Sequence, residues 1–135
     1  NMDIKKEKVL CQKQWAKNKY LVLSYSSKIY LEIRTYLKQE EVSLEKVNKL
    51  IKQAINLPED KGQVTNALHH VWGYFKKFAT KEEKDNFFEM IEDYHINKTT
   101  KEDLIEEVKK LLEKYPNTYL EQSTFINGGK DETLA

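Results

Sequence analysis

The chain has 135 residues, a net charge of +1 and 33% charged residues, with only four Gly and two Pro, a composition typical of one helical globular domain. Its longest apolar run, residues 20–23, is far shorter than the ~20 residues of a membrane span, and the lysine-rich start has no apolar stretch after it, so we expect a cytoplasmic protein. The lone Cys11 excludes a disulfide within the chain and a cysteine-bound iron–sulfur cluster, and we expect it to be a small core residue.

The first half of the chain predicts three helices. The first runs from Asp3 to about Tyr25, and its inner face holds Ile4, Cys11, Trp15 and Val22. A second row on the same helix combines cations with an aromatic ring: Lys13, Lys17, Tyr20 and Ser24. Ser26 or Ser27 is expected to cap a second helix that ends at Lys38, and Ser43 a third that ends before Pro58.

The segment from Val64 to Phe78 is predicted to be a helix around which the others are arranged. Its apolar positions recur at helical spacing: Val64, Leu68, Val71, Phe75 and Phe78. The opposite face has a polar row: Asn66, His70, Gly73 and Lys77. Because a glycine inside a helix costs roughly 1 kcal/mol relative to alanine, we expect a neighbouring helix or a ligand to approach the backbone at Gly73.

Three further helices are expected before a frayed tail. Thr80 and Glu83 have the spacing of a capping box, Thr100 and Asp103 open the next helix in similar fashion, and a short last helix covers about residues 117–125. The sequence therefore predicts an all-α domain of six or seven helices with bundle-like or orthogonal packing. Its ordered core is expected to cover about residues 3–126, with a flexible tail at 127–135.

Charge is unevenly distributed along the chain. Residues 1–38 hold nine Lys or Arg against three acids, residues 61–81 hold four Lys and no acid, and residues 82–113 hold five Lys against eleven acids. If the first two segments are neighbours in space, they form one basic face. Solvated lysines are the simpler interpretation, and the acidic segment is expected to be a solvated face.

Few residues are arranged for chemistry. The histidines are His69, His70 and His95, and only His69 or His70 could share a helix face with a metal-binding partner four residues away. No acid or cysteine occupies those positions, so we expect neither a metal nor a cofactor. His70, oriented by the Asn66 amide, is a weak candidate for acid–base catalysis because imidazole titrates near neutral pH. A hydrogen-bonded helix histidine explains it equally.

Three segments, Thr65–Lys76, Ile91–Tyr94 and Lys114–Leu120 followed by Gln122, resemble the YbgA family of domains of unknown function. The family pattern centres on residues that read here Asn66, Leu68, His70, Gly73, Tyr74 and Phe75, with a downstream Tyr-Pro. The resemblance extends from about Trp15 to Phe125. It is weaker at the amino-terminal motif, where two family histidines are replaced although Lys17 and Lys19 keep cationic positions.

The resemblance implies a small helical domain that occurs alone or fused behind a desulfidase domain acting on thiolated uracil, including 4-thiouridine in tRNA. In such a fusion the desulfidase or another nucleotide-modifying protein does the chemistry, and the helical domain holds the RNA. Our leading hypothesis is thus a non-catalytic module that binds tRNA or another RNA. The expected contact residues are Lys13, Lys17, Lys19, Tyr20, Asn66, His70, Gly73, Tyr74, Lys76 and Lys77.

Two other classes of function stay open at this point. One is an enzyme of unrecognised type that acts on a nucleotide-like substrate with His70 as acid or base, which a deep pocket around Asn66, His70 and Tyr74 would favour. The other is a protein-interaction module whose acidic segment, 82–113, meets a basic partner. A broad, shallow basic face would favour RNA.

Overall fold

Seven helices make up the described part of the chain. The structure is a computed structural model, which describes residues 2–128. Within that range it has no strand, and its helices are α1 (Met2–Tyr25), α2 (Ser27–Tyr36), α3 (Leu44–Ile55), α4 (Lys61–Trp72), α5 (Lys81–His95), α6 (Lys101–Lys114) and α7 (Thr118–Glu121). The predicted all-α fold is confirmed. From residue 129 onward, the tail that we expected to be flexible lies outside the described residues.

The helices after α1 begin where polar side chains cap them. In each, the side chain before the first helical residue accepts a hydrogen bond from the backbone N–H three residues later; the caps are Ser26, Ser43, Asp60, Thr80, Thr100 and Asn117. The capping box is also confirmed, because the Glu83 carboxylate accepts a bond of 2.8 Å from the Thr80 N–H. Such a cap typically stabilises a helix by about 1 kcal/mol.

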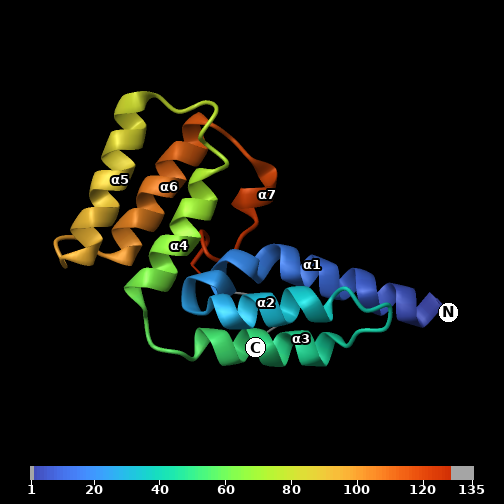
Figure 1. The fold of residues 1–135 in the computed structure, drawn as a ribbon. Helices are drawn as coiled ribbons and strands as arrows, with labels where there is room; N and C mark the ends of the chain where they lie inside the picture. The colour runs from blue at the N-terminus through green and yellow to red at the C-terminus, as the bar shows by residue number, and fades with distance from the viewer. Residues whose placement is uncertain (1, 129–135) are drawn as a thin grey trace.

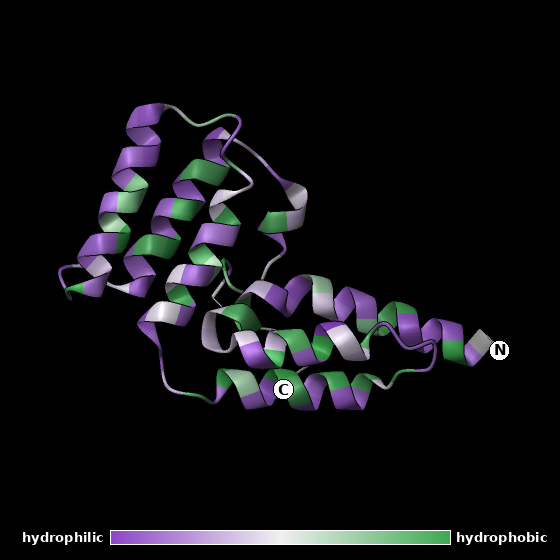
Figure 2. Ribbon diagram, in the orientation of Figure 1, coloured by the Kyte–Doolittle hydropathy of each residue, from purple (hydrophilic) through white to green (hydrophobic). Residues whose placement is uncertain are grey.

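The helices form two groups that meet at α1 (Figure 1). α1, α2 and α3 surround one hydrophobic cluster, which includes Cys11 as the sequence led us to expect. α4, α5, α6 and the last turns of α1 surround the other. Hydrophobic and hydrophilic residues alternate along α5 and α6 in Figure 2, as amphipathic helices require. α1 therefore contributes to both clusters.

The last turns of α1 are buried on every side. The five consecutive residues 20–24 are all buried, because α4 lies against one side of α1 and α2 and α3 against others. From the sequence, Tyr20 and Ser24 were expected on a second row of this helix with Lys13 and Lys17, available for contact with a ligand. That assignment is wrong for this half of the helix, where no face is free.

The central helix differs from its prediction at both ends. α4 begins at Lys61 after Asp60 and ends at Trp72, and residues 73–78 form turns. Gly73 caps the helix, with its N–H directed at the carbonyls of His70 and Val71, and a Cβ at Gly73 would lie 3.1 Å from the His70 carbonyl oxygen. The close approach that we expected at Gly73 is thus made by the chain's own tight turn. As a result Phe78 is not on the buried face, and 65% of it is exposed.

The chain after α6 packs into the core rather than forming a longer helix. α7 is four residues long, shorter than the predicted 117–125, and residues 123–126 are buried. Thr124 holds them against α1: its N–H donates to the Lys17 carbonyl over 2.8 Å and its hydroxyl to the Asn18 Oδ1 over 2.8 Å. α2 also ends two residues before the predicted Lys38. No helix among residues 2–128 has both the length and the apolar character needed to cross a bilayer.

Candidate nucleic-acid interface

The two basic segments of the sequence are neighbours in the fold. α1 and α4 lie against each other, as we predicted for the helix from Asp3 and the central helix. Lys13 is exposed on α1, Lys17 and Lys19 are half-buried, and Lys76 and Lys77 are exposed in the turns after α4. One set of lysines thus lies on α1, and the other lies in the turns that follow its neighbour α4.

Lys19 joins the residues of these segments through aromatic rings. Its ammonium lies 5.3 Å from the ring centre of Tyr20 and 5.1 Å from that of Tyr119, which follows the start of α7. The Tyr119 ring in turn lies nearly parallel to that of Tyr74, with 6.3 Å between centres and 13° between planes. A cation over an aromatic face is attracted by the ring quadrupole. The structure therefore gathers Lys19, Tyr20 and Tyr74 and adds Tyr119 to them.

Tyr20 is the buried member of this cluster. Only 8% of Tyr20 is exposed, so its ring is not on the surface for base stacking, contrary to our expectation. Its hydroxyl oxygen lies 2.8 Å from that of Tyr74, and the two rings meet edge to face. Burial, and next the hydrogen bond to Tyr74, raise the pKa of the Tyr20 phenol, which stays neutral at physiological pH. Tyr20 positions Tyr74, which is half-buried.

The same two chain segments form a second pair of rings. The Phe78 ring lies over the Tyr115 ring, with 6.3 Å between centres and 23° between planes. Tyr74 pairs with Tyr119 while Phe78, four residues later, pairs with Tyr115, four residues earlier. Segments 73–79 and 115–121 therefore run antiparallel past each other, and each contributes one ring to each pair. We call these four rings the aromatic ladder.

Glu83 fixes the outer end of the aromatic ladder. The Tyr115 hydroxyl donates to one Glu83 carboxylate oxygen over 2.7 Å, and the Lys114 ammonium lies 3.1 Å from the other. The pKa of Glu83 is lowered to about 2, first by the hydrogen bond from the Thr80 backbone, then by the Tyr115 hydroxyl and by Lys114. The carboxylate is therefore charged and paired, and it holds the Tyr115 ring in place.

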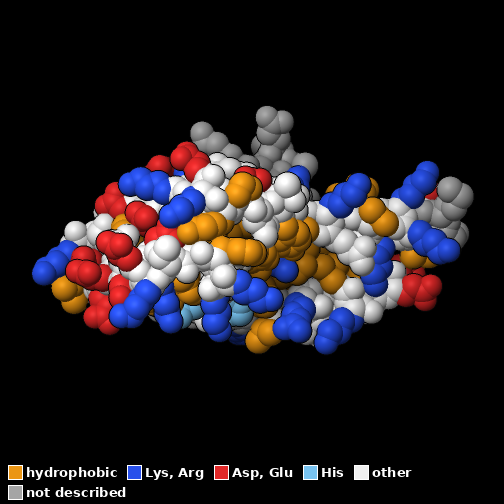
Figure 3. Space-filling view, turned by 90° about the horizontal axis from the view of Figure 1, so that it is seen from above, with side chains coloured by type: hydrophobic (Ala, Val, Ile, Leu, Met, Phe, Trp, Pro, Cys, Tyr) orange, Lys and Arg blue, Asp and Glu red, His pale blue; other side chains and the backbone are white. Residues whose placement is uncertain are grey.

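Figure 3 looks onto the end of the molecule where segment 73–79 and α7 lie in Figure 1. Hydrophobic side chains gather across the middle of this face, Lys and Arg side chains follow its lower edge and the side of α1, and acidic side chains gather over α5 and α6. A surface with paired aromatic rings and a cation beside them fits single-stranded nucleic acid, whose bases stack on rings while its phosphates meet lysines.

The remaining predicted residues lie on the outer surface of α4 or directly after its end. Asn66 and His70 are exposed, as is Gly73. An enzyme would hold its substrate away from water around such a histidine, whereas here the side chain of His70 stands in solvent. The nearby His69 has a packing role, since its ring meets that of Phe88 edge to face at 5.1 Å.

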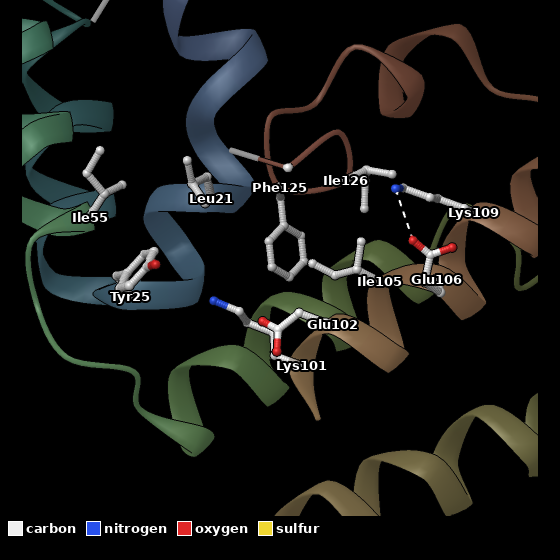
Figure 4. Close-up of a pocket in the computed structure, with 11 residues that line it drawn as sticks. Leu21, Tyr25, Ile55, Lys101, Glu102, Ile105, Glu106, Lys109, Phe125 and Ile126 are labelled. Carbon is white, nitrogen blue, oxygen red and sulfur yellow. Dashed lines mark hydrogen bonds and ion pairs between the residues drawn. The ribbon is translucent and has the colours of Figure 1, made fainter. Parts of the chain in front are cut away.

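A separate cavity lies elsewhere in the fold. It has a volume of about 420 Å3 and lies between the end of α1, α6 and the last described residues (Figure 4). Its lining mixes apolar side chains, among them Leu21, Ile105 and Phe125, with charged ones, which include the ion pair of Lys109 with Glu106. None of the predicted contact residues lines it. Within residues 2–128, no three His, Cys, Asp or Glu side chains come together in a way that would hold a metal ion.

Sequence reasoning missed three of the four ladder residues as surface groups. Tyr115 and Tyr119 belong to the Tyr-Pro segment that supports the family resemblance, which was the available signal, but nothing in the sequence pairs them with Phe78 and Tyr74. Phe78 was placed in the core because its spacing continues the apolar row of α4. Only Tyr74 was named in advance.

Comparison with known proteins agrees with the resemblance. The model of a family described as "Protein of unknown function (DUF1722)" matches residues 19–128, and the YbgA family is this family. No curated protein matches the chain, and no solved structure does. The match includes the whole aromatic ladder.

Proposed function

The chain belongs to the DUF1722 family, a family of unknown function, and from that premise we propose that it is a non-catalytic module that binds RNA, in the first instance tRNA, for a nucleotide-modifying partner. The observation that supports this most is the aromatic ladder beside Lys19: four rings in two parallel pairs, next to a cation, on a face edged by lysines. Rings stack on bases of any sequence, and lysines contact phosphates.

The exposure of Phe78 supports a role in binding rather than in packing. A phenylalanine with 65% of its surface in water loses the hydrophobic stabilisation that burial would give it. Phe78 lies on Tyr115, which is itself held by Glu83, so the ring is both available and pre-positioned. Pre-positioned rings lose little conformational entropy when a base stacks on them.

The experiment is a titration of the protein with unfractionated tRNA at several salt concentrations, followed by fluorescence anisotropy. If about five lysines each neutralise one phosphate, log affinity falls with log salt at a slope of roughly −3.5 to −4.5. Replacing Lys77 by Glu is expected to flatten the slope by about one unit or more and to weaken binding to all RNA sequences alike.

The matched control is Lys52→Glu, which makes the same charge change on an exposed position of α3. It should leave the salt slope close to that of the parent protein. Absence of tRNA binding at about 100 mM salt, where contacts to phosphates still hold, would overturn the proposal. So would equal effects of the two variants.

A further inference from the structure

A second recess lies next to the aromatic ladder, between α1 and α2. It has a volume of about 290 Å3, and its lining includes Gln12, Trp15, Arg34, Lys38 and Tyr119. We call it the α1–α2 groove. It shares Tyr119 with the ladder, so the two surfaces are continuous. None of its lining residues was among the predicted RNA contacts.

The aromatic wall of the groove is rigid. Trp15 is half-buried, and its ring lies 5.3 Å from that of Tyr30, which packs against both hydrophobic clusters. Tyr119 is held through Tyr74 and Lys19. A flat ligand thus meets one indole ring, that of Trp15, and one phenol ring, that of Tyr119, and both are held in position by other contacts.

The other wall is cationic. Arg34 is the only arginine of the chain, and it lines the groove together with Lys38, which lies four residues later, just past the end of α2. Both side chains are exposed, and within the described part of the chain neither forms an ion pair. A guanidinium presents a planar fork of donors that matches the oxygens of a phosphate.

We propose that the α1–α2 groove binds one nucleotide of a single-stranded RNA, with the base against Trp15 and Tyr119 and the phosphate at Arg34 and Lys38. Rings, a paired set of cations and the Gln12 amide are the groups that recognise a base face, a phosphate and a base edge. The volume is close to the lower end of small-molecule pockets, about 300 Å3, which suits one nucleotide. This inference rests on the proposed function and assigns it a specific site.

The test uses uridine 5′-monophosphate, with uridine and inorganic phosphate as separate probes, and follows the two tryptophan indole N–H signals by NMR. Trp15 lines the groove, whereas Trp72 is buried in the core and stacked on Phe87. We expect the nucleotide to shift the Trp15 signal, assigned with Trp15→Phe, and to leave the Trp72 signal in place. It should bind more tightly than either of its parts.

Arg34→Gln is expected to weaken nucleotide binding roughly 10- to 100-fold, the usual range for a lost charge-assisted contact, and Arg34→Lys should restore part of it. Lys28→Gln removes the same charge from an exposed position at the start of α2 and should have no effect. Equal effects of Arg34→Gln and Lys28→Gln, an unmoved Trp15 signal, or the same Trp15 shift with phosphate alone would each overturn the groove assignment.

The two proposals fail separately. If the protein binds tRNA but its Trp15 signal does not respond to the nucleotide, the proposed RNA-binding function stands and the groove assignment is wrong. If the Trp15 signal responds but the protein does not bind tRNA, the groove is a mononucleotide site and the proposed RNA-binding function is wrong.

Discussion

The hydroxyl groups of Tyr20 and Tyr74 lie 2.8 Å apart and join the buried end of α1 to the turns after α4. Through this contact a residue enclosed in the core sets the position of a ring on the surface. The Tyr74 ring then pairs with Tyr119, whose other neighbour is Lys19. The inner end of the aromatic ladder therefore depends on the packing of α1.

Tyr20→Phe removes this contact and keeps the ring. We expect the free energy of unfolding to fall by about 0.5–1.5 kcal/mol, the usual net value of one hydrogen bond. The contribution of Tyr20 to the free energy of unfolding should also depend on pH. Because burial raises the pKa of Tyr20 in the folded state, its contribution is complete below the unfolded pKa of about 10 and is lost as pH rises above it.

Urea denaturation of parent and variant between pH 8 and about 11, which spans the tyrosine pKa, measures both effects. The parent should lose stability more steeply than the variant at the alkaline end. Parallel curves would show that Tyr20 ionises as easily in the folded protein as in the unfolded chain.

Phe75 and Phe78 lie three residues apart in the same segment, and their truncation should destabilise the protein to very different extents. Phe75 is 1% exposed, so Phe75→Ala is expected to cost about 3–5 kcal/mol of stability. Phe78→Ala should cost about 1 kcal/mol or less, since it removes only one exposed ring contact. Urea midpoints with unchanged m-values measure the difference. A similar cost for both would mean that Phe78 is buried in solution.

Glu83 gives the protein a specific acid sensitivity. Its pKa is lowered from 4.5 to about 2, so its stabilising contribution is present above the unfolded pKa and is lost as pH falls toward the folded value. Glu83→Gln should therefore be less stable than the parent at neutral pH, with a difference that shrinks between about pH 4.5 and 2.

Thermal unfolding of both proteins across that pH range gives the measurement. Asp85→Asn is the control, since Asp85 makes only an exposed pair of 3.8 Å with Lys81 and such pairs contribute little. A Glu83→Gln penalty that stays constant down to the acid limit would contradict the assigned contacts.

Stacking on the aromatic ladder is separable from contacts to phosphate. Phe78→Ala is expected to weaken RNA binding roughly 5- to 150-fold, as loss of one base–aromatic stack does, without changing the salt slope. Ile96→Ala is the control: Ile96 is equally exposed, at 61%, but follows the opposite end of α5 from Thr80. Anisotropy titrations decide between the two, and a change in slope with Phe78→Ala would show that the ring holds a cation rather than a base.

His70 is expected to read RNA rather than to hold its phosphates. It is exposed on α4, one turn before Tyr74, and so is placed for a base edge or a sugar hydroxyl. His70→Ala should reduce discrimination between RNA sequences and leave the salt slope nearly unchanged. His95→Ala is the matched control, because His95 is engaged with the Thr65 hydroxyl at 2.9 Å. Unchanged discrimination in a competition assay would remove His70 from the interface.

Helix starts and cores were predictable because they depend on nearby residues. Thr80 with Glu83, or Ser43 before an apolar row, contains enough local information to begin a helix. The end of α4 was not predictable from the sequence, because Phe75 and Phe78 continue the apolar spacing of the helix beyond the turn at Gly73 that ends it. The prediction that Tyr20 and Ser24 lie on an accessible row of α1 was wrong for a different reason. Residues 20–24 are buried on all sides, so the helix there has no polar face that hydrophobic periodicity could identify.

The candidate site depends on long-range pairing that no local pattern contains. Lys19 and Tyr74 were predicted from their types, but their meeting with Tyr119 arises only when residues after α6 fold back onto α1. Phe78 gave a misleading signal, because a large apolar residue at core spacing is usually buried. The groove residues Trp15 and Arg34 belong to different helices and come together only through the packing of α1 on α2.

Thr124 donates to the backbone of Lys17 and to the side chain of Asn18 across more than a hundred residues of chain. We expect these contacts to form after the local helices, because closing so long a loop costs chain entropy before the contacts can stabilise it. Tyr119 reaches Lys19 through the same return of the chain. A polypeptide that lacks residues 117–128 would thus lose the Tyr74–Tyr119 pair and keep only the Phe78–Tyr115 pair of the ladder. The proposed RNA-binding surface would therefore be complete only once these last residues have folded back onto α1.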